Sequence, residues 1–154
     1  MEGRCQCSLI RFTTPLPEPI KIFVCHCTEC RHQSSSAYGI SVIFPVFEIP
    51  DPKLNNKNNN DYNTTSGKGD ENAAIGIYTR QTLTGHTLEC LFCRNCGARL
   101  IDRIPGEPTL CVKGGCLVGL NRAMMTKAAH VWCKEAVVEV PEGVERWEEN
   151  PRWG

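Results

Sequence analysis

The spacing of the cysteines is the feature of this sequence that most restricts its fold. Eleven cysteines occur in 154 residues, and seven of them stand in tight C-x-C and C-x-x-C groups. Neighbours this close suit metal ligation better than disulfide pairing, and an odd total leaves one thiol over. No apolar leader precedes the groups, so we expect a reducing, cytoplasmic compartment in which the thiols are free to bind metal.

Two of the groups together predict a closed metal site. Cys93 and Cys96 form a C-x-x-C turn followed by Gly97, an arrangement in which backbone N–H groups point at the sulfurs. Two thiolates do not complete a tetrahedron, so a second pair must come from elsewhere, and Cys5 and Cys7 can supply it. We expect a structural zinc on these four cysteines, which we call the quartet. The alternative is four buried free thiols.

The third group, C-H-C-T-E-C, predicts a different kind of site. Cys25, Cys27 and Cys30, which we call the trio, lie close together, and no fourth cysteine follows at a matching spacing. Three protein ligands with one vacant position are typical of a catalytic zinc, and three thiolates suit the ion to binding a thiolate rather than to generating hydroxide. The alternative is a second closed site. Four side chains could complete it: His26, His32, Cys90 and Cys133.

Alternating apolar residues predict a mainly β fold. The pattern is clear at Ile20, Ile22 and Val24 and again from Tyr38 to Phe44. The predicted strands cover residues 8–13, 20–24, 38–44, 75–79, 87–92, 99–103, 109–113, 129–133 and 137–140. Prolines separate the strands, and no window of a dozen residues shows the apolar stripe of a helix. We therefore expect only helical turns, around 29–34 and 121–127. The cysteines outside the quartet and trio are expected to be small core residues: Cys90, Cys111, Cys116 and Cys133.

The length of the chain is typical of one compact domain, and we expect residues 1–154 to form a single one. Residues 51–72 are rich in Asn, Lys, Gly, Ser and Asp and almost lack large apolar side chains. This composition predicts a flexible insertion. A domain boundary is the alternative, but neither flank holds the whole quartet, so the two halves must fold together.

The distribution of charge argues against two classes of partner. Seventeen Lys and Arg balance seventeen Asp and Glu, and the basic residues are scattered rather than gathered into a patch that could neutralise phosphates. We therefore expect no nucleic-acid partner. No apolar run approaches the roughly 20 residues that span a bilayer, so we expect no membrane segment. The sequence does not indicate an oligomeric state.

These motifs resemble those of the glutathione-dependent formaldehyde-activating enzyme family, which shares its domain with centromere protein V. The main matching stretches are G-R-C-Q-C at 3–7, V-C-H-C-T-E-C-R-H-Q-S-S-S-A at 24–37 and F-C-R-N-C-G-A-R-L at 92–100. V-K-G-G at 112–115, A-H-V-W at 129–132 and P-E-G-V-E-R-W at 141–147 are similar too. The insertion departs from the family pattern, as does Val137-Val138, where a tryptophan is expected. The resemblance implies a β-tent of stacked antiparallel sheets, a structural zinc on the quartet and a catalytic zinc on the trio.

The resemblance also implies an activity and residues that would hold the substrate. The family joins glutathione to formaldehyde as S-hydroxymethylglutathione, a carbon–sulfur lyase reaction run in the synthetic direction. Arg31, Gln33 and Ser36 follow the trio where family members carry similar polar residues, and they are candidates to hold a carboxylate or amide; a solvated turn is the alternative. His130 and Trp132 are candidates for the pocket wall, although strand packing is the expected role of Trp132.

We therefore expect a zinc-dependent enzyme with two Zn²⁺ ions per chain. It would act on a small carbonyl compound or its thiol adduct, with glutathione or another thiol as co-substrate. No Ser-His-Asp or paired-carboxylate set offers a different chemistry. The competing hypothesis is a zinc scaffold without activity that binds a protein partner.

Overall fold

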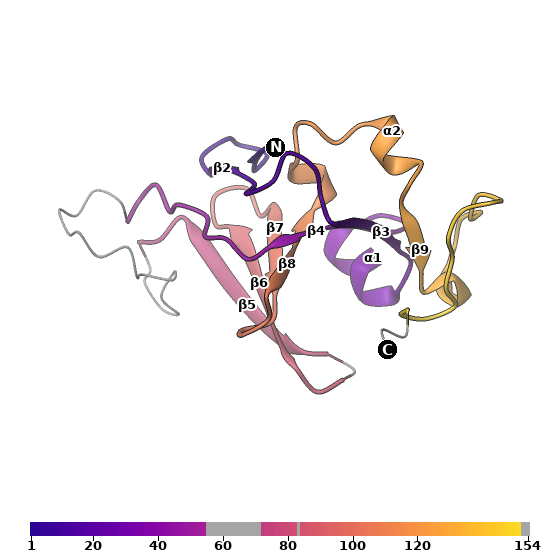
Figure 1. Cartoon of the computed structure of the whole chain (residues 1–154). Helices are drawn as coiled ribbons and strands as arrows, with labels where there is room; N and C mark the ends of the chain where they lie inside the picture. The colour runs from indigo at the N-terminus through magenta and orange to yellow at the C-terminus, as the bar shows by residue number, and fades with distance from the viewer. Residues whose placement is uncertain (55–71, 83, 152–154) are drawn as a thin grey trace.

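Most of the described chain is built around one large sheet (Figure 1). The computed structural model describes residues 1–54, 72–82 and 84–151. Within these residues, seven strands follow the order β5-β6-β7-β8-β4-β3-β9, and β1 and β2 form a separate two-stranded sheet. The strands are β1 (Glu2–Arg4), β2 (Arg11–Thr13), β3 (Lys21–Cys25), β4 (Gly39–Pro45), β5 (Ile75–Gln81), β6 (Thr87–Cys93), β7 (Arg99–Arg103), β8 (Thr109–Lys113) and β9 (Ala129–Val131). The helical elements are α1 (Thr28–Ser34), α2 (Arg122–Met125), η1 (Gly114–Cys116) and η2 (Cys133–Glu135).

The strand pairing places the core in the middle of the large sheet. Neighbouring strands are antiparallel, except that β9 runs parallel to β3. Val42 and Phe44 of β4, Leu100 of β7 and Val112 of β8 are fully buried. Residues spaced two apart on one strand face the same side of a sheet, so Val42 and Phe44 are buried together, whereas Ile40 is half-buried and Tyr38 is exposed at the start of the same alternating set. The helix α1 lies beside β3 and β4 (Figure 1).

The hairpin of β1 and β2 is held against the segment that follows β8. The backbone N–H of Val118 donates to the carbonyl of Glu2 at 2.9 Å, and Gly3 forms a bridge with Leu117. Phe12 lies directly over Gly3, where a Cβ atom would come within 2.3 Å of the ring. Glycine is required there because two elements approach closely. This contact fixes the loop that carries the first two cysteines.

A buried carboxylate joins the two ends of the predicted insertion. Asp51 accepts hydrogen bonds from the backbone N–H groups of Lys53, Ala74 and Ile75 at 2.9–3.1 Å. Its side chain therefore links the start of the predicted insertion to the first residue of β5. Residues 55–71, on which most of the prediction of flexibility falls, lie outside the described residues.

The prediction of a mainly β fold is confirmed, but one predicted strand is wrong. Residues 137–140 form no strand, and Val137 and Val138 are 60% and 41% exposed. The free edge of β9 is instead occupied by residues further along the chain: His130 N–H donates to Glu145 O, and Trp147 N–H donates to His130 O, both at 2.8 Å. Residues 145–147 therefore pair with β9, rather than the nearer segment 137–140. The three-residue strand β1 was not predicted.

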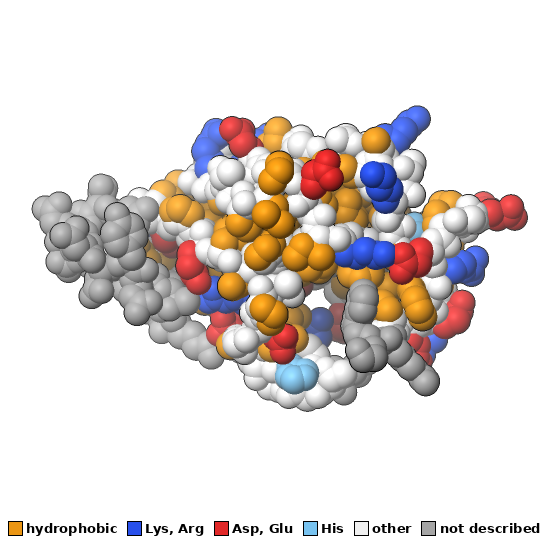
Figure 2. All heavy atoms as spheres, in the orientation of Figure 1, with side chains coloured by type: hydrophobic (Ala, Val, Ile, Leu, Met, Phe, Trp, Pro, Cys, Tyr) orange, Lys and Arg blue, Asp and Glu red, His pale blue; other side chains and the backbone are white. Residues whose placement is uncertain are grey.

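The surface agrees with the balanced charge of the sequence. On the face drawn in Figure 2, acidic and basic side chains are interspersed around an apolar area, and no basic patch is visible. None of the helices among residues 1–54, 72–82 and 84–151 is long and apolar enough to cross a membrane.

Candidate metal centres

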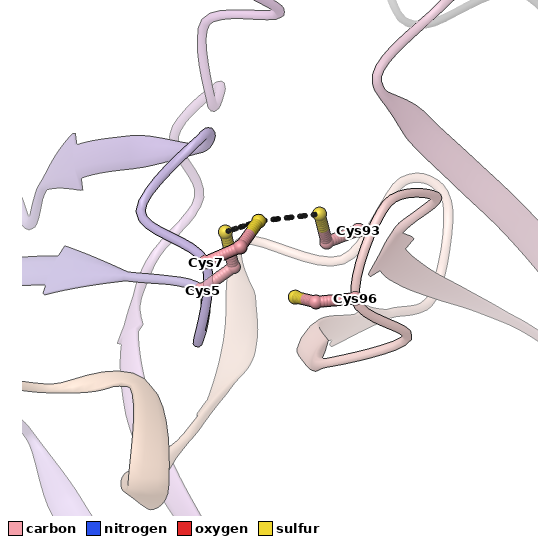
Figure 3. Close-up of side chains that lie close together, drawn as sticks. All are labelled: Cys5, Cys7, Cys93 and Cys96. Atoms are coloured by element: carbon pink, nitrogen blue, oxygen red, sulfur yellow. Dashed lines mark hydrogen bonds between the residues drawn. The ribbon is translucent and has the colours of Figure 1, made fainter.

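The quartet brings together two pairs of cysteines from distant parts of the chain. Cys5 and Cys7 lie on the loop after β1, while Cys93 ends β6 and Cys96 lies in the turn before β7 (Figure 3). The four sulfurs all lie within 4.8 Å of one another. The Cys5–Cys7 and Cys7–Cys93 sulfur separations are 3.5 and 3.8 Å. Four sulfurs at about 2.3 Å from a zinc ion would stand roughly 3.8 Å apart, so the donor set fits a tetrahedral ion.

The local backbone explains why the second pair points inward. Cys93 N–H donates to Ala98 O at 2.9 Å, and Gly97 N–H donates back to Cys93 O at 2.8 Å. Gly97 has a φ of 73°, in the left-handed region that glycine adopts without strain. On the other side, Ile10 N–H donates to the sulfur of Cys5 at 3.3 Å. Both loops are thus closed by backbone hydrogen bonds that turn the sulfurs towards each other.

The thiols of the quartet differ in their readiness to ionise. Hydrogen bonds from the Asn95 side chain and the Leu9 backbone, together with neighbouring thiols, lower the pKa of Cys7 to about 6. Burial raises the pKa of Cys93 to about 12. Without a cation, these two thiols cannot both be charged near pH 7. A bound divalent ion would remove that obstacle, which is the usual reason why thiolate clusters form around metal.

The trio sits where β3 passes into α1. Cys25 ends β3, Cys27 is the N-cap of α1, and Cys30 lies in the first turn, where its N–H donates to the sulfur of Cys27 at 3.4 Å. The three sulfurs all lie within 4.8 Å of one another. No further His, Cys, Asp or Glu side chain joins them anywhere in the described part of the chain. The alternative ligands considered from the sequence therefore stay outside this cluster in the structure.

The three thiols of the trio share their charge unequally. Hydrogen bonds from Cys25 and Cys30 lower the pKa of Cys27 to about 2. The contact with Cys27 in turn raises the pKa of Cys25 to about 12, and contacts with Cys25 and Cys27 raise that of Cys30. Without a metal, one thiolate therefore forms and the other two stay protonated. The soft donors fit a zinc ion, which would let all three ionise.

His26 turns away from the trio although it lies between two of its members in the sequence. Its side chain is buried, and its Nε2 lies 3.0 Å from Nδ1 of His130 on β9. The two rings stack with centroids 5.2 Å apart, and the Nδ1 atom of His26 has no hydrogen-bond partner. His26 N–H also donates to Val131 O at 3.0 Å. The histidine thus ties the trio loop to β9.

A cavity of about 740 Å³ lies beside the quartet. Cys5 and Cys96 of the quartet form part of its wall, and Gly39 brings it next to the trio. A Cβ atom at Gly39 would lie 3.1 Å from the Cβ of Cys30 and 3.6 Å from its sulfur, so the absent side chain keeps this side of Cys30 uncrowded. The cavity gives a small molecule room beside the trio.

A family model described as glutathione-dependent formaldehyde-activating enzyme matches residues 1–135. The chain belongs to this family. The stretch matched to the formaldehyde-activating enzymes includes the quartet, the trio and the residues of the cavity wall. No curated protein matches the chain. A crystal structure of a protein from Rhodobacter sphaeroides is similar, with a TM-score of 0.54 and 19% identity, covering 85% of this chain and 100% of that one. At this identity the similarity shows the fold alone.

The structure separates the side chains that the formaldehyde-activating family pattern suggested as substrate contacts. Gln33 and Ser36 line the cavity, whereas Arg31 and His130 do not. Arg31 donates to the hydroxyl of Thr28 at 3.2 Å, and its buried Nε atom has no partner.

Trp132 and two of the cysteines outside the clusters differ from their predicted packing. Trp132 is only half-buried, follows β9 with a φ of 57°, and donates to Asn150 at 2.9 Å, so it does not pack within a strand. Of the four remaining cysteines, Cys90 and Cys116 are buried, as expected for core residues, while Cys111 and Cys133 are half-buried.

Sequence reasoning missed the basic residues of the cavity wall. Arg4, Arg99 and Lys113 all border it. The available signal was a lysine at the end of the largely apolar strand Thr109–Lys113, where a charge must be buried or paired. That signal does not say where the lysine lies, because the cavity forms only when four separate segments of the chain meet.

Proposed function

We propose that the protein is a zinc-dependent enzyme of the carbon–sulfur lyase type. It acts on a small carbonyl compound or its thiol adduct, with glutathione or another small thiol, as in the formation of S-hydroxymethylglutathione. The proposal is supported above all by the contrast between the clusters: one set has four sulfurs, whereas the other has only three and lies next to Gly39, a residue of the cavity wall. Membership of the formaldehyde-activating family supports the reaction class.

In this proposal the two clusters have different roles. Cys5, Cys7, Cys93 and Cys96 hold a structural zinc that joins the N-terminal loop to the β6–β7 turn. Cys25, Cys27 and Cys30 hold the second zinc and leave one position for a ligand. Zinc bound there would supply positive charge that stabilises a thiolate or polarises a carbonyl oxygen. Because so many of the thiols must stay reduced, we place the protein in a reducing compartment, the cytoplasm.

The chain itself contributes positioning. The reaction forms a bond between the thiol sulfur and the carbonyl carbon, and the thiol proton passes to the carbonyl oxygen. Holding both molecules in one cavity beside Cys30 replaces a bimolecular encounter by a local one. Gln33 and Ser36, which reach the cavity from α1 and the turn after it, can donate hydrogen bonds to the polar parts of either molecule.

The proposal is tested by counting metal and measuring adduct formation on the same samples. Native mass spectrometry should find two zinc ions per chain, and NMR exchange spectroscopy should show faster formation of hydroxymethyl thiol from formaldehyde and glutathione. Cys30→Ser should retain one zinc and lose the acceleration. Cys133→Ser is the matched control, because Cys133 lies outside both clusters, and it should keep both.

Two outcomes would reject the enzymatic proposal. One is a zinc-loaded protein whose cobalt-substituted spectrum does not respond to glutathione or any small thiol. The other is a Cys133→Ser variant that loses the second zinc, because the trio would then be a closed structural site.

A further inference from the structure

The Lys, Arg, Asp and Glu side chains that line the cavity are all cationic, and two cysteines of the quartet, Cys5 and Cys96, complete one side of its wall. Three cationic residues, Arg4, Arg99 and Lys113, border it. Among the described residues that form its wall, none is Asp or Glu, although acidic and basic residues are equally numerous in the chain. The other polar side chains that face it are neutral: Gln6, Gln33, Ser34, Ser36 and Tyr38. This composition favours an anionic ligand.

Lys113 is the most deeply placed of the three cations. Its side chain is 10% exposed, and its ammonium group pairs with Oδ2 of Asp102. The same carboxylate accepts a hydrogen bond from Arg99 at 2.9 Å through its other oxygen. One carboxylate thus faces two cations, and with Arg4 at the rim a positive excess remains. An ammonium group held in a poorly hydrated position gains more from a further anion than an exposed one does.

The position of Lys113 also relates it to the trio. Lys113 pairs with Ser41 in the β4–β8 register, and Gly39, two residues before Ser41 on β4, touches Cys30. Both groups therefore lie along β4, Lys113 beside Ser41 and Cys30 beside Gly39. Gly39 also lines the cavity, so a molecule held near Lys113 and Gly39 lies on the side of the cavity wall nearest the trio.

We propose that this cavity binds a carboxylate group of the substrate, with Lys113 as its principal anchor. The inference rests on the proposed function and restricts it to a thiol or carbonyl compound that carries a carboxylate. Gln33 and Ser36 approach the same ligand from the side of α1. The competing explanation is that the cations only balance the negative charge of metal-bound thiolates. Comparing the binding of two ligands that differ in charge distinguishes the carboxylate subsite from this charge-balance explanation.

The test uses two thiols that differ only in that carboxylate, N-acetylcysteine and N-acetylcysteine amide. Isothermal titration of each into the zinc-loaded full chain gives two dissociation constants. We expect the acid to bind at least tenfold more tightly than the amide, since a hydrogen bond to a charged group is worth about that much or more. Lys113→Met should remove the preference, and Lys127→Met, an exposed lysine outside this cavity, should preserve it.

The possible failures are distinguishable. Equal affinity of the unaltered chain for acid and amide would overturn the carboxylate subsite and leave the proposed function standing. Absence of binding by both thiols would overturn both. Should Lys113→Met fail to fold, Lys113→Gln takes its place, because the amide can still donate to Asp102: a lost preference supports the subsite, and an unchanged preference overturns Lys113 as its anchor.

Discussion

The loss of one sulfur should affect the stability of the fold differently in the two clusters. Cys96 belongs to a set that joins two distant loops, whereas Cys30 belongs to a set formed within one short segment. We therefore expect Cys96→Ser to unfold or aggregate the chain, since a structural zinc supplies roughly 10–16 kcal/mol of apparent binding free energy, part of it folding energy. Cys30→Ser should stay folded. Circular dichroism and thermal melting with metal counting measure the difference.

An equal loss of structure in both variants would show that the trio is structural as well. Cys133→Ser again serves as the control, since its thiol belongs to neither set. Its melting temperature should lie close to that of the unaltered protein.

His130 supports a buried partner rather than a reaction. Removing its ring in His130→Ala leaves His26 buried with neither ring nitrogen hydrogen-bonded. A buried polar group that loses its partner costs about 1–3 kcal/mol, and we expect the free energy of unfolding to fall by that amount. Urea denaturation measures it. His86→Ala, at an exposed position, should change stability by less than about 0.5 kcal/mol; an equal loss there would contradict the role of the pair.

The cysteine groups could be sorted from the sequence because ligands of one site often come in local pairs. C-x-C and C-x-x-C spacings carry their own turn geometry, so the quartet and trio followed without knowledge of the fold. Lys113 could not be assigned in the same way. Its importance depends on Asp102, Arg99 and Gly39, which only the packing of β4, β7 and β8 brings near it.

At the scale of elements, the longer strands followed from the apolar pattern, whereas the short elements at the N-terminus and beside β9 did not. Residues 109–113 match β8, whose buried apolar residues Leu110 and Val112 are two apart, and residues 99–103 match β7, where Leu100 and Ile101 are buried on both faces of an interior strand. The edge elements were less predictable. β1 is a short polar strand fixed by Val118 and Leu117, and the edge of β9 is filled by Glu145–Trp147 rather than by the nearer valines.

The carboxylate at the base of the insertion should contribute strongly to stability. In Asp51→Ala the backbone N–H groups of Lys53, Ala74 and Ile75 lose their acceptor. We expect about 2–4 kcal/mol of destabilisation, because each buried donor left alone costs roughly 1–3 kcal/mol. Chemical denaturation measures it, with the exposed Glu107→Ala as control. A loss below about 0.5 kcal/mol would show that these donors find other acceptors.

At the scale of the whole molecule, metal binding and proton release should be coupled. Near pH 7 Cys27 is already a thiolate, because its pKa is lowered to about 2, while Cys25 and Cys30 hold their protons, because theirs are raised. Loading the trio should therefore release about two protons. The sample is protein whose quartet is intact and whose trio is empty. Calorimetric titration of zinc into it, in buffers of different ionisation enthalpy, counts the protons released.

Protons compete with zinc for the sulfurs of the trio, so the affinity of the trio for zinc falls as pH falls. Two protons imply a loss of roughly a hundredfold for each pH unit around neutrality. A release of fewer than one proton would mean that the thiols are already ionised before the metal arrives.

The long span of the quartet affects how the protein can be made. Cys7 and Cys93 are 86 positions apart, so the first pair leaves the ribosome well before its partners have been synthesised. During that interval the early thiols are open to oxidation or to capture by a competing ion such as copper. We therefore expect the yield of correctly assembled protein to depend on zinc supply during translation rather than on zinc added after lysis.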